Sequence, residues 1–476
     1  MGGILAVDRN ESPSFTVAII GGGVSGAVCA KELSRLGAGR LTVTVFDQGR
    51  QLGGRAAHRR VQEDGEYVSS ASVAPFAFDH GCQFFRADSP RFREELLREW
   101  LDRKWAAEWK GKFGTLQNSS DVSVTKASFF GFPHQPPYYC GVGGMCFLPM
   151  ALLEDATTTG AVQVRGGVRV ANTVKLSDGK WLLSGTSGKA ALHDTAEEEA
   201  ARSAPDALGE FDVVVVTDVS ASMAGWHRAS AGIPEEVAAR VRGRTRVVLF
   251  TALFAFERPV NVDLQAMSAA DDVLWFAART RSKPGLDEAS THDCWTFVST
   301  PKYAAAEVER VPMQDPKTGA FRPQEMHYLR EGPCAELLAA FAKLLSRSGH
   351  DSALPLPKAV YVGGQRWGSS FPAPSNDGRD AKGRGPTTVE VLGVAYDSAA
   401  SLTLAPADDR CTSEMPEEKK PRPADHENGN APRDFLADDE RRIYYASDYV
   451  SGQLPGLEAS ALSALDAARH IVSKLL

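Results

Sequence analysis

The sequence lacks three features that would each point to a particular environment or partner. No apolar run reaches the roughly 20 residues that a membrane-spanning helix needs, and runs such as VVLFTALFAF at 247–256 suit a buried strand instead. The seven cysteines are scattered and form no CxxC pair. This argues against a zinc site or a disulfide framework and favours buried, inert thiols in a reducing compartment. The formal net charge is −7 without a basic cluster, so a nucleic-acid-binding role is disfavoured.

The N-terminal segment MGGILAVDRNESPSF also lacks a recognisable signal. It has no basic stretch followed by an apolar core, which argues against secretion. MGG begins like a myristoylation signal, but Ala6 stands where Ser or Thr is required. We therefore expect a cytoplasmic protein without a membrane span, and a plastid or another organelle is the alternative. No metal site is expected.

The composition is that of a soluble globular enzyme. The chain has 476 residues, of which 43% are hydrophobic and 24% charged, and this length predicts two domains. Residues 15–47 read as strand, glycine turn, helix and strand, which is a βαβ unit. Residues 161–186 alternate as a β-meander would, and residues 91–109 have the spacing of one amphipathic helix. FDVVVVTDV at 211–219 is typical of a strand buried on both faces.

The turn GGGVSG has the spacing GxGxxG, directly after the first strand and before the helix. Gly21 permits the tight turn, Gly23 lets the backbone approach a pyrophosphate, and Gly26 lets helix and strand pack closely. The helix N-terminus at Ser25 supplies N–H groups and the positive end of the helix dipole. Asp47 closes the next strand, 21 residues after Gly26, where a residue that holds a ribose hydroxyl is expected. The turn therefore predicts a bound dinucleotide.

The stretch RQLGGR at 50–55 follows the second strand. By itself it is compatible with a plain turn. In this position, Gly53 and Gly54 could bring backbone against a second part of the same dinucleotide. Arg55, and with weaker support Arg50, could pair with its phosphates.

Together these motifs resemble the FAD-binding signature of the flavin-containing amine oxidase superfamily. The resemblance implies bound FAD, and NAD at this site is the less favoured cofactor. The C-terminal segment has no cysteine that could carry a covalent flavin, so non-covalent binding is expected.

Other stretches are similar to the renalase branch of that superfamily, namely FDHGCQFFRADSPRF (78–92), YCGVGGMCFLPMALL (139–153), RTRSKPG (279–285) and GGQRWGSSFP (363–372). The resemblance places Asp79, Gly81 and Gln83 along the flavin. There Gly81 would permit close backbone approach, and Gln83 would hydrogen-bond the ring edge. A turn with local hydrogen bonds is the alternative for Asp79. Val168, in the predicted meander, is also expected in the cofactor site.

The C-terminal stretch YYASDYVSGQLPGLEASALSALDAA resembles the last segment of the superfamily. There the resemblance places Asp448 against the ribityl and pyrophosphate region. Leu457, Glu458 and Ala459 would lie at a helix N-terminus, whose dipole stabilises the electron-rich part of the flavin. Ser447 departs from the pattern, because glycine usually precedes the acid.

We expect an α/β fold in which a Rossmann-like, doubly wound FAD-binding domain is interleaved with an α+β substrate domain built on a mixed β-sheet. The FAD-binding domain should comprise 15–90, 140–225 and 440–476, and the substrate domain 91–139 and 226–439. Within the latter, 374–388 and 408–434 are predicted to be disordered surface insertions.

The expected reaction is hydride transfer from a small-molecule donor to flavin N5, with reoxidation by oxygen and formation of hydrogen peroxide. Reduced NAD(P) isomers, as in renalase, are the leading donor. The pocket candidates are Gln83, Lys283, Arg366 and Trp367: the two cations could hold a nucleotide phosphate, and Trp367 could stack on a ring. The alternatives are a flavin amine oxidase, a desaturase or isomerase with an apolar tunnel, and a flavin-binding redox module without turnover.

Overall fold

The protein is described by a computed structural model. It describes residues 15–37, 39–49, 51–69, 72–117, 129, 137–187, 205–217, 237, 241, 246–286, 292–313, 322, 324–372 and 434–476. Arg50 lies outside the described residues, as do the two predicted insertions apart from Asp434.

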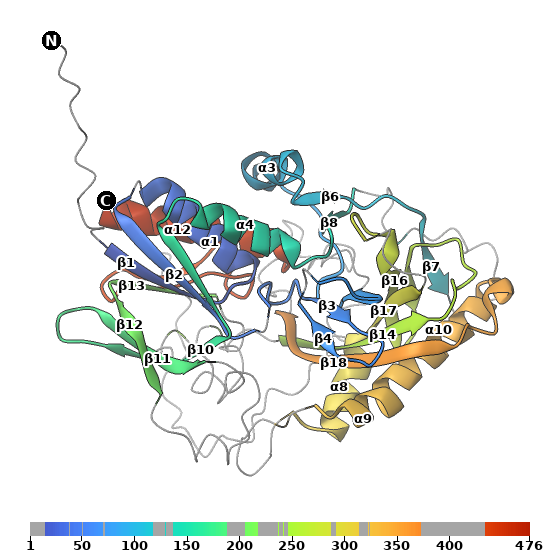
Figure 1. The fold of residues 1–476 in the computed structure, drawn as a ribbon. Coiled ribbons are helices and arrows are strands. Elements are labelled where there is room, and N and C mark those ends of the chain that lie inside the picture. The colour runs from blue at the N-terminus through green and yellow to red at the C-terminus, as the bar shows by residue number, and fades with distance from the viewer. Residues whose placement is uncertain are drawn as a thin grey trace, which may run out of the picture.

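The first half of the molecule is built on a six-stranded sheet in which only one edge strand is antiparallel (Figure 1). Its order is β19-β20-β13-β1-β2-β9. The strands are β1 (Phe15–Ile20), β2 (Leu41–Asp47), β9 (Val162–Gly166), β13 (Val213–Val216), β20 (Ile443–Tyr445) and the antiparallel β19 (Leu436–Asp438). The sheet therefore joins segments from the beginning, the middle and the end of the chain.

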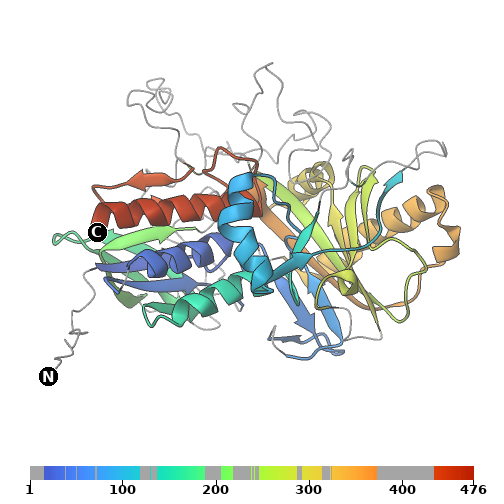
Figure 2. The same cartoon turned by 90° about the horizontal axis from the view of Figure 1, so that it is seen from above.

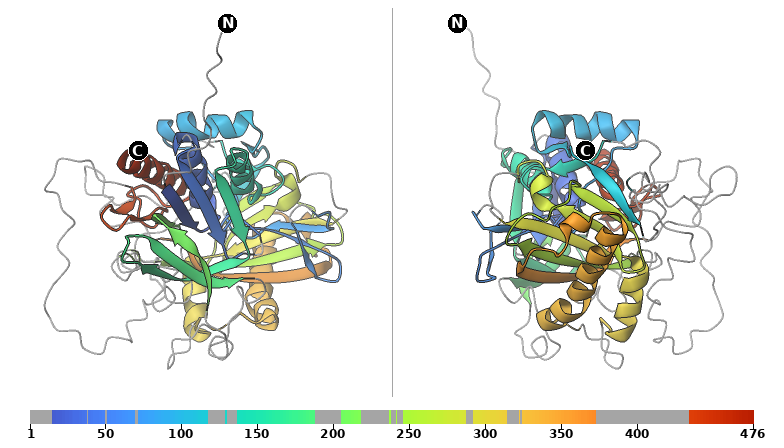
Figure 3. Two further views of the ribbon diagram at one scale, coloured as in Figure 1. Left: turned by 60° about the vertical axis from the view of Figure 1, so that its left-hand side comes forward. Right: turned by 90° about the vertical axis from the view of Figure 1, so that its right-hand side faces the viewer.

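Side-chain alternation divides this sheet between two layers. Val17 and Ile19 pack with the helices α1 (Val24–Gly37), α4 (Phe147–Thr157) and α12 (Leu457–Leu475). Ala18 and Ile20 pack on the other face, against an antiparallel sheet of β10 (Val168–Lys175), β11 (Trp181–Ser187) and β12 (Asp206–Phe211). Figure 3 shows the helices and this sheet on opposite faces of the central strands.

This arrangement confirms the α/β fold and refines two expectations. The second face is covered by strands, where doubly wound topology would place helices. Within the predicted meander, Val162–Gly166 instead extends the parallel sheet beside β2. The run Val213–Val216 is buried on both faces, as its unbroken apolar sequence predicts.

The second half is a mixed six-stranded sheet, ordered β18-β14-β17-β16-β15-β7. Its strands are β7 (Phe113–Gln117), β14 (Arg246–Phe256), β15 (Ala266–Ala270), β16 (Leu274–Arg279), β17 (Asp293–Ser299) and β18 (Ala359–Pro372). Leu337 and Phe341 of α10 (Ala335–Arg347) pack against one face. Further helices are α8 (Pro301–Arg310) and α9 (Met326–Leu329), and a π-helical turn, Arg330–Cys334, joins α9 to α10. Short 3-10 turns lie at Thr280–Ser282 and Asp351–Ala353.

Small elements lie at the junction of the two halves. One is a three-stranded sheet of β3 (His58–Val61), β4 (Tyr67–Val68) and β5 (Phe76–Asp79). Another is a helical segment of α2 (Pro90–Phe92), a π-helical turn (Arg93–Leu97) and α3 (Arg98–Asp102). In Figure 2 this light-blue segment crosses the molecule between the halves.

The predicted helix at 91–109 is wrong beyond Asp102. Lys104 has a φ of 57°, and the N–H of Trp105 donates back to Trp100 O at 2.9 Å. The chain then continues as β6 (Ala106–Glu108), which pairs with β8 (Tyr139–Gly141). The partner of β6 lies distant in sequence, and the helical periodicity of a segment gives no information about such a partner.

Candidate functional site

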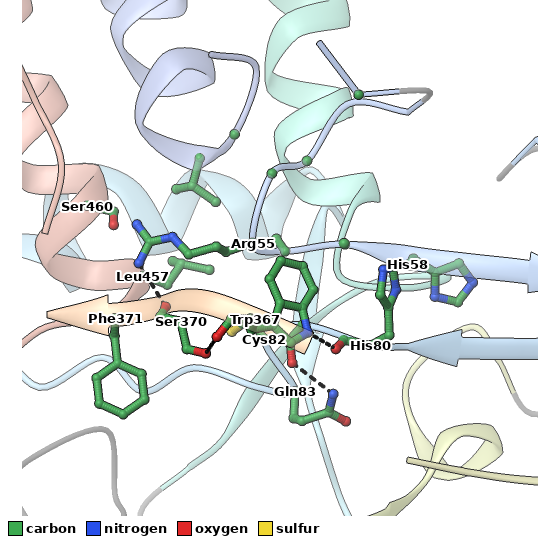
Figure 4. A pocket seen from close by; sticks show the side chains of 18 of the residues that line it. Arg55, His58, His80, Cys82, Gln83, Trp367, Ser370, Phe371, Leu457 and Ser460 are labelled. Atoms are coloured by element: carbon green, nitrogen blue, oxygen red, sulfur yellow. Dashed lines mark hydrogen bonds between the residues drawn. The ribbon is translucent and has the colours of Figure 1, made fainter. Parts of the chain in front are cut away.

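A cavity of about 1380 Å³ lies where the two halves meet. Its wall includes the glycine turns after β1 and β2, the start of α12, the segment after β5 and one face of the second sheet. Figure 4 shows part of this wall from close by. The volume exceeds the roughly 300–1,000 Å³ of sites for drug-sized ligands, so it suits a dinucleotide together with a second small molecule.

The first glycine turn follows the expected geometry. Gly21, Gly23 and Ser25 line the cavity. Gly26 does not, because it packs beneath the turn: a Cβ on Gly26 would lie 1.9 Å from Gly21 O. Gly26 is therefore the position at which helix and strand touch, as the motif predicts.

The diglycine of RQLGGR packs against that first turn. The N–H of Gly53 donates to Gly22 O at 3.0 Å, and Gly23 and Gly53 pair as an isolated bridge. Gly53 and Gly54 have φ of +126° and +54°, values that favour glycine. A Cβ on Gly54 would come within 3.3 Å of Gly23 Cα. The two turns thus form one surface of bare backbone.

The Asp47 carboxylate holds together the turn that follows β1 and the turn that follows β2. It accepts from the N–H of Gly22 and of Gly49, each at 2.7 Å, and Asp47 lines the cavity. Val168 also lines it, beside the same turn, since the N–H of Gly167 donates to Gly49 O at 3.3 Å.

Arg55 forms a bidentate ion pair with Asp448 in the cavity wall. Arg55 Nη1 and Nη2 donate to Asp448 Oδ2 and Oδ1 at 2.9 and 2.6 Å. Nη1 also donates to Ser370 O on β18 at 3.1 Å (Figure 4). Burial works to lower the pKa of Arg55, but Asp448 outweighs it and the pKa is raised. Arg55 therefore stays cationic and links both halves of the molecule.

The N-terminus of α12 borders the same cavity. Leu457, Glu458 and Ser460 line it, and the Ser25 hydroxyl donates to Ser460 O at 3.0 Å, which brings the first turns of α1 and α12 together. The Glu458 carboxylate accepts from the N–H groups of Asp88 and Ser89. Ala459 is buried and does not line the cavity.

Asp79 is the centre of a buried polar cluster behind the wall. Its Oδ1 accepts from the Met145 N–H at 2.8 Å and contacts His58 Nδ1 at 2.9 Å. Its Oδ2 accepts from Lys283 Nζ, also at 2.9 Å. Burial works to raise the pKa of Asp79, but Lys283 and His58 outweigh it and hold the pKa below its usual value. Asp79 itself does not line the cavity.

Gln83 lines the cavity, but its amide is committed to this cluster. Nε2 donates to Asp79 O at 2.7 Å and Gly81 O at 2.9 Å, and Oε1 accepts from Lys283 Nζ at 3.2 Å. Both amide hydrogens are used, so in this arrangement the hydrogen bond expected between Gln83 and a flavin ring would be one that Oε1 accepts. Gly81 lines the cavity, and a Cβ there would lie 2.1 Å from Arg55 O.

The two cations predicted to hold a nucleotide phosphate are turned away from the cavity. Lys283 is 1% exposed and pairs with Asp79, and Arg366 Nη2 donates to Arg322 O at 2.8 Å. Neither lines the cavity. Trp367 does, and its Nε1 donates to His80 O at 2.8 Å (Figure 4).

The second sheet contributes a face that we call the sheet wall, made of Leu249, Thr251, Trp275, Phe276, Val298, Gly364, Gln365, Trp367, Ser370 and Phe371. Thr251 was not singled out in the sequence, although it is the one polar residue of the run VVLFTALFAF. Arg59 and Arg60 on β3 also line the cavity and were missed. The two adjacent basic residues of HRRV (58–61) could have pointed to them.

Five of the six cysteines in the described part of the chain are buried, in line with inert thiols. Cys82 is the exception, because it is partly exposed and lines the cavity. Over the described ranges, no cluster of three or more His, Cys, Asp or Glu residues could bind a metal ion. Nor does any helix found there have the length and apolar character to span a bilayer.

Residues 19–100, which include the glycine turn, match the family model of the NAD(P)-binding Rossmann-like domain. Two solved structures resemble nearly the whole chain. Cyclohexylamine oxidase from Brevibacterium oxydans IH-35A is 12% identical with a TM-score of 0.52, and the match covers 97% of this chain and 100% of the other. Reduced UDP-galactopyranose mutase is 10% identical with a TM-score of 0.53 and 96% coverage of both chains. At these identities the likeness establishes a shared fold.

Proposed function

We propose that the chain is an FAD-dependent oxidoreductase of the amine oxidase type, which oxidises a small donor and passes the electrons to oxygen. The observation that carries this proposal is the single cavity that runs from the GxGxxG turn, past Arg55 and the start of α12, to the sheet wall. Such a cavity has room for a dinucleotide and a donor side by side. The name of the cyclohexylamine oxidase that shares the fold supports the oxidase class.

The residues of the cavity fit FAD. The paired glycine turns offer a cradle that a Cβ would obstruct, since one on Gly54 would crowd Gly23. The N-termini of α1 and α12 meet at Ser25 and Ser460, and helix N-termini stabilise negative charge. When bound, FAD supplies the hydride acceptor and the route for electrons to oxygen.

Each part of the wall has a proposed role. Gly21, Gly23 and the first N–H groups of α1 bind the pyrophosphate, with Arg55 beside them. Asp47 accepts from a ribose hydroxyl, because it lines the cavity at the end of β2, where an acid that holds the ribose is expected. Asp448 orients Arg55, and the start of α12 stabilises the electron-rich side of the ring.

Reduced NAD(P) isomers remain a second donor class, supported by the sequence resemblance to renalase. Because Lys283 and Arg366 are turned away, the phosphates of such a donor would need other partners. Arg59 and Arg60 line the cavity and could supply them.

The test starts with the purified full-length protein. We expect a flavin absorption spectrum, and release of FAD when the protein is denatured. Anaerobic mixing with amines and with reduced pyridine nucleotides should then bleach the flavin with one donor class, and oxygen should restore the colour with formation of hydrogen peroxide. Protein that binds no FAD after reconstitution would refute the cofactor assignment. Bound flavin that no donor reduces would instead favour a redox module without turnover.

A further inference from the structure

The sheet wall carries a row of side chains that is polar at one end and apolar at the other. Thr251 on β14 pairs directly with Gln365 on β18 and with Val298 on β17, and Val298 pairs with Phe276 on β16. All four line the cavity. Paired residues of neighbouring strands share one face, and strands lie about 4.8 Å apart. The row therefore places an amide and a hydroxyl beside two apolar groups.

The apolar end of the row is widened by a break in register. The pairing of β16 with β17 shifts between Leu274 and Phe276, and such irregularities re-aim side chains. As a result, the consecutive residues Trp275 and Phe276 both line the cavity. The Trp275 ring lies 6.4 Å from that of Phe371, another residue of the sheet wall. This end offers aromatic and aliphatic surface to a ring-shaped ligand.

The hydroxyl in the middle of the row has no hydrogen-bond partner among the described residues. Thr251 is 3% exposed, and its Oγ1 is buried without a partner. Leaving a buried hydroxyl unpaired costs about 1–3 kcal/mol. A ligand acceptor that draws this hydroxyl toward the cavity, by rotation of the Thr251 side chain, would remove this cost.

The charges near the row disfavour a cation. No described residue of the sheet wall is charged. Two described cations contact the sheet wall. Arg59 donates to Gln365 Oε1 at 3.1 Å and to the Tyr67 hydroxyl at 3.2 Å, both neutral partners, and Arg55 Nη1 donates to Ser370 O at 3.1 Å. The adjacent carboxylate of Asp79 is occupied by Lys283. An ammonium group on this wall would lose its hydration and face a guanidinium instead of a carboxylate.

We propose that the sheet wall binds an uncharged ring that carries a hydrogen-bond acceptor, such as a carbonyl or carboxamide, and that it excludes an ammonium group. The acceptor meets Thr251, with Gln365 beside it, and the ring packs on Val298, Phe276 and Trp275. This inference rests on the proposed function only in taking the bound ring to be the donor, and among the donor classes proposed above it selects an uncharged ring over a protonated amine.

Three ligands with the same ring test this inference at neutral pH: benzamide is uncharged, benzylamine is a cation and benzoate is an anion. Binding to the full-length protein is followed by tryptophan fluorescence, because Trp275 and Trp367 line the cavity. We expect benzamide to bind most tightly, with a Kd at least about tenfold lower than that of benzylamine, since burying an unpaired ammonium group costs more than burying an amide. Equal or tighter binding of benzylamine or of benzoate would overturn the proposal.

Two variants locate the contact. Thr251→Val should raise the Kd of benzamide about threefold to tenfold, because it removes a single hydrogen bond. Thr251→Ser keeps the hydroxyl and should have a Kd close to that of wild type. Thr186→Val is the matched control, since Thr186 also has a buried hydroxyl without a partner but does not line the cavity. An unchanged Kd in Thr251→Val, or an equal loss in Thr186→Val, would also refute the proposal.

The fluorescence measurement does not require bound flavin, so the two proposals can fail separately. Thr251-dependent binding of benzamide to a protein that binds no FAD would uphold this inference and refute the proposed function. A flavin-loaded protein that shows no preference among the three ligands would refute this inference and leave the proposed function standing.

Discussion

The guanidinium of Arg55 and the carboxylate of Asp448 form two parallel hydrogen bonds although 393 positions separate the residues in the chain. Arg55 follows the diglycine that packs on the GxGxxG turn, and Asp448 lies shortly before α12. The ion pair therefore fixes the distance between the part of the wall that we propose for the pyrophosphate and the part that we propose for the flavin ring. Neither motif could set this distance alone.

Replacing Arg55 tests this role. Arg55→Lys keeps the charge but loses the planar fork, and we expect flavin affinity to fall about tenfold or more, because hydrogen bonds to charged groups contribute about 1.5–3 kcal/mol each. The ratio of flavin to protein after dialysis measures the effect. Arg91→Lys is the control, since Arg91 makes a similar fork to Asp466 away from the cavity. A flavin content equal to that of wild type in Arg55→Lys would contradict the assignment.

A methyl group at Gly26 should separate α1 from β1. Its Cβ would lie 1.9 Å from Gly21 O, and overpacking of this kind costs at least about 1–3 kcal/mol. We therefore expect Gly26→Ala to lower the melting temperature and the flavin content. Gly166→Ala is a suitable control, because a Cβ at Gly166 meets nothing within 4 Å and its φ is not positive. Similar losses in both variants would argue against a specific close contact.

Removing Asp79 should leave Lys283 as an unpaired buried charge. Breaking a buried ion pair from one side costs about 3–5 kcal/mol, so Asp79→Asn should be strongly destabilised in urea unfolding. The double variant Asp79→Asn with Lys283→Met should regain part of the loss. Asp272→Asn breaks the exposed pair with Lys302 and should cost at most about 1 kcal/mol. A double variant less stable than both single variants would contradict this account.

The same pair predicts a pH dependence. Because the folded protein holds the pKa of Asp79 below its ordinary value of 3.8, this carboxylate adds stability above that pH. The added stability is lost as the pH falls through the folded pKa. Wild type should therefore lose more unfolding free energy in acid than Asp79→Asn, and parallel curves would argue against a lowered pKa.

Cys82 should react slowly despite lining the cavity. Burial raises the pKa of its thiol to about 11, so the reactive thiolate is scarce at neutral pH. We expect alkylation by iodoacetamide to become about tenfold faster for each unit by which the pH is raised toward that pKa. Mass spectrometry of the peptide that contains Cys82 follows the reaction. Fast alkylation at neutral pH would contradict the shift. Bound FAD should slow the reaction, and Cys82→Ser identifies the signal.

The parts of the site that could be predicted from sequence are those fixed by local backbone geometry. GxGxxG requires glycines at given spacings, and the structure has Gly21 at φ +115° and a Gly26 without room for a side chain. The carboxylate of Asp47 lies where the end of a parallel strand must bring it. These features depend on neighbours within a few tens of residues.

The parts that could not be predicted depend on distant partners. Lys283 was expected to face a phosphate, but an isolated sequence does not reveal that Asp79, 204 positions away, offers it a buried carboxylate. The amide of Gln83 is committed for the same reason. Thr251 lay in a run that predicts only a buried strand. Its place opposite Gln365 and Val298 depends on the order of strands in the sheet.

The strand order has a consequence for how the protein folds during its synthesis. The strand Ile443–Tyr445 adds to the edge of Val213–Val216, and the last helix then covers the same sheet. A ribosome adds residues from the N-terminus, at about 5–20 per second. For most of the time of synthesis, the glycine turns and Arg55 therefore exist before Asp448 and α12 have been made. The cavity closes only once these late segments have emerged, so capture of the cofactor should follow translation rather than guide it.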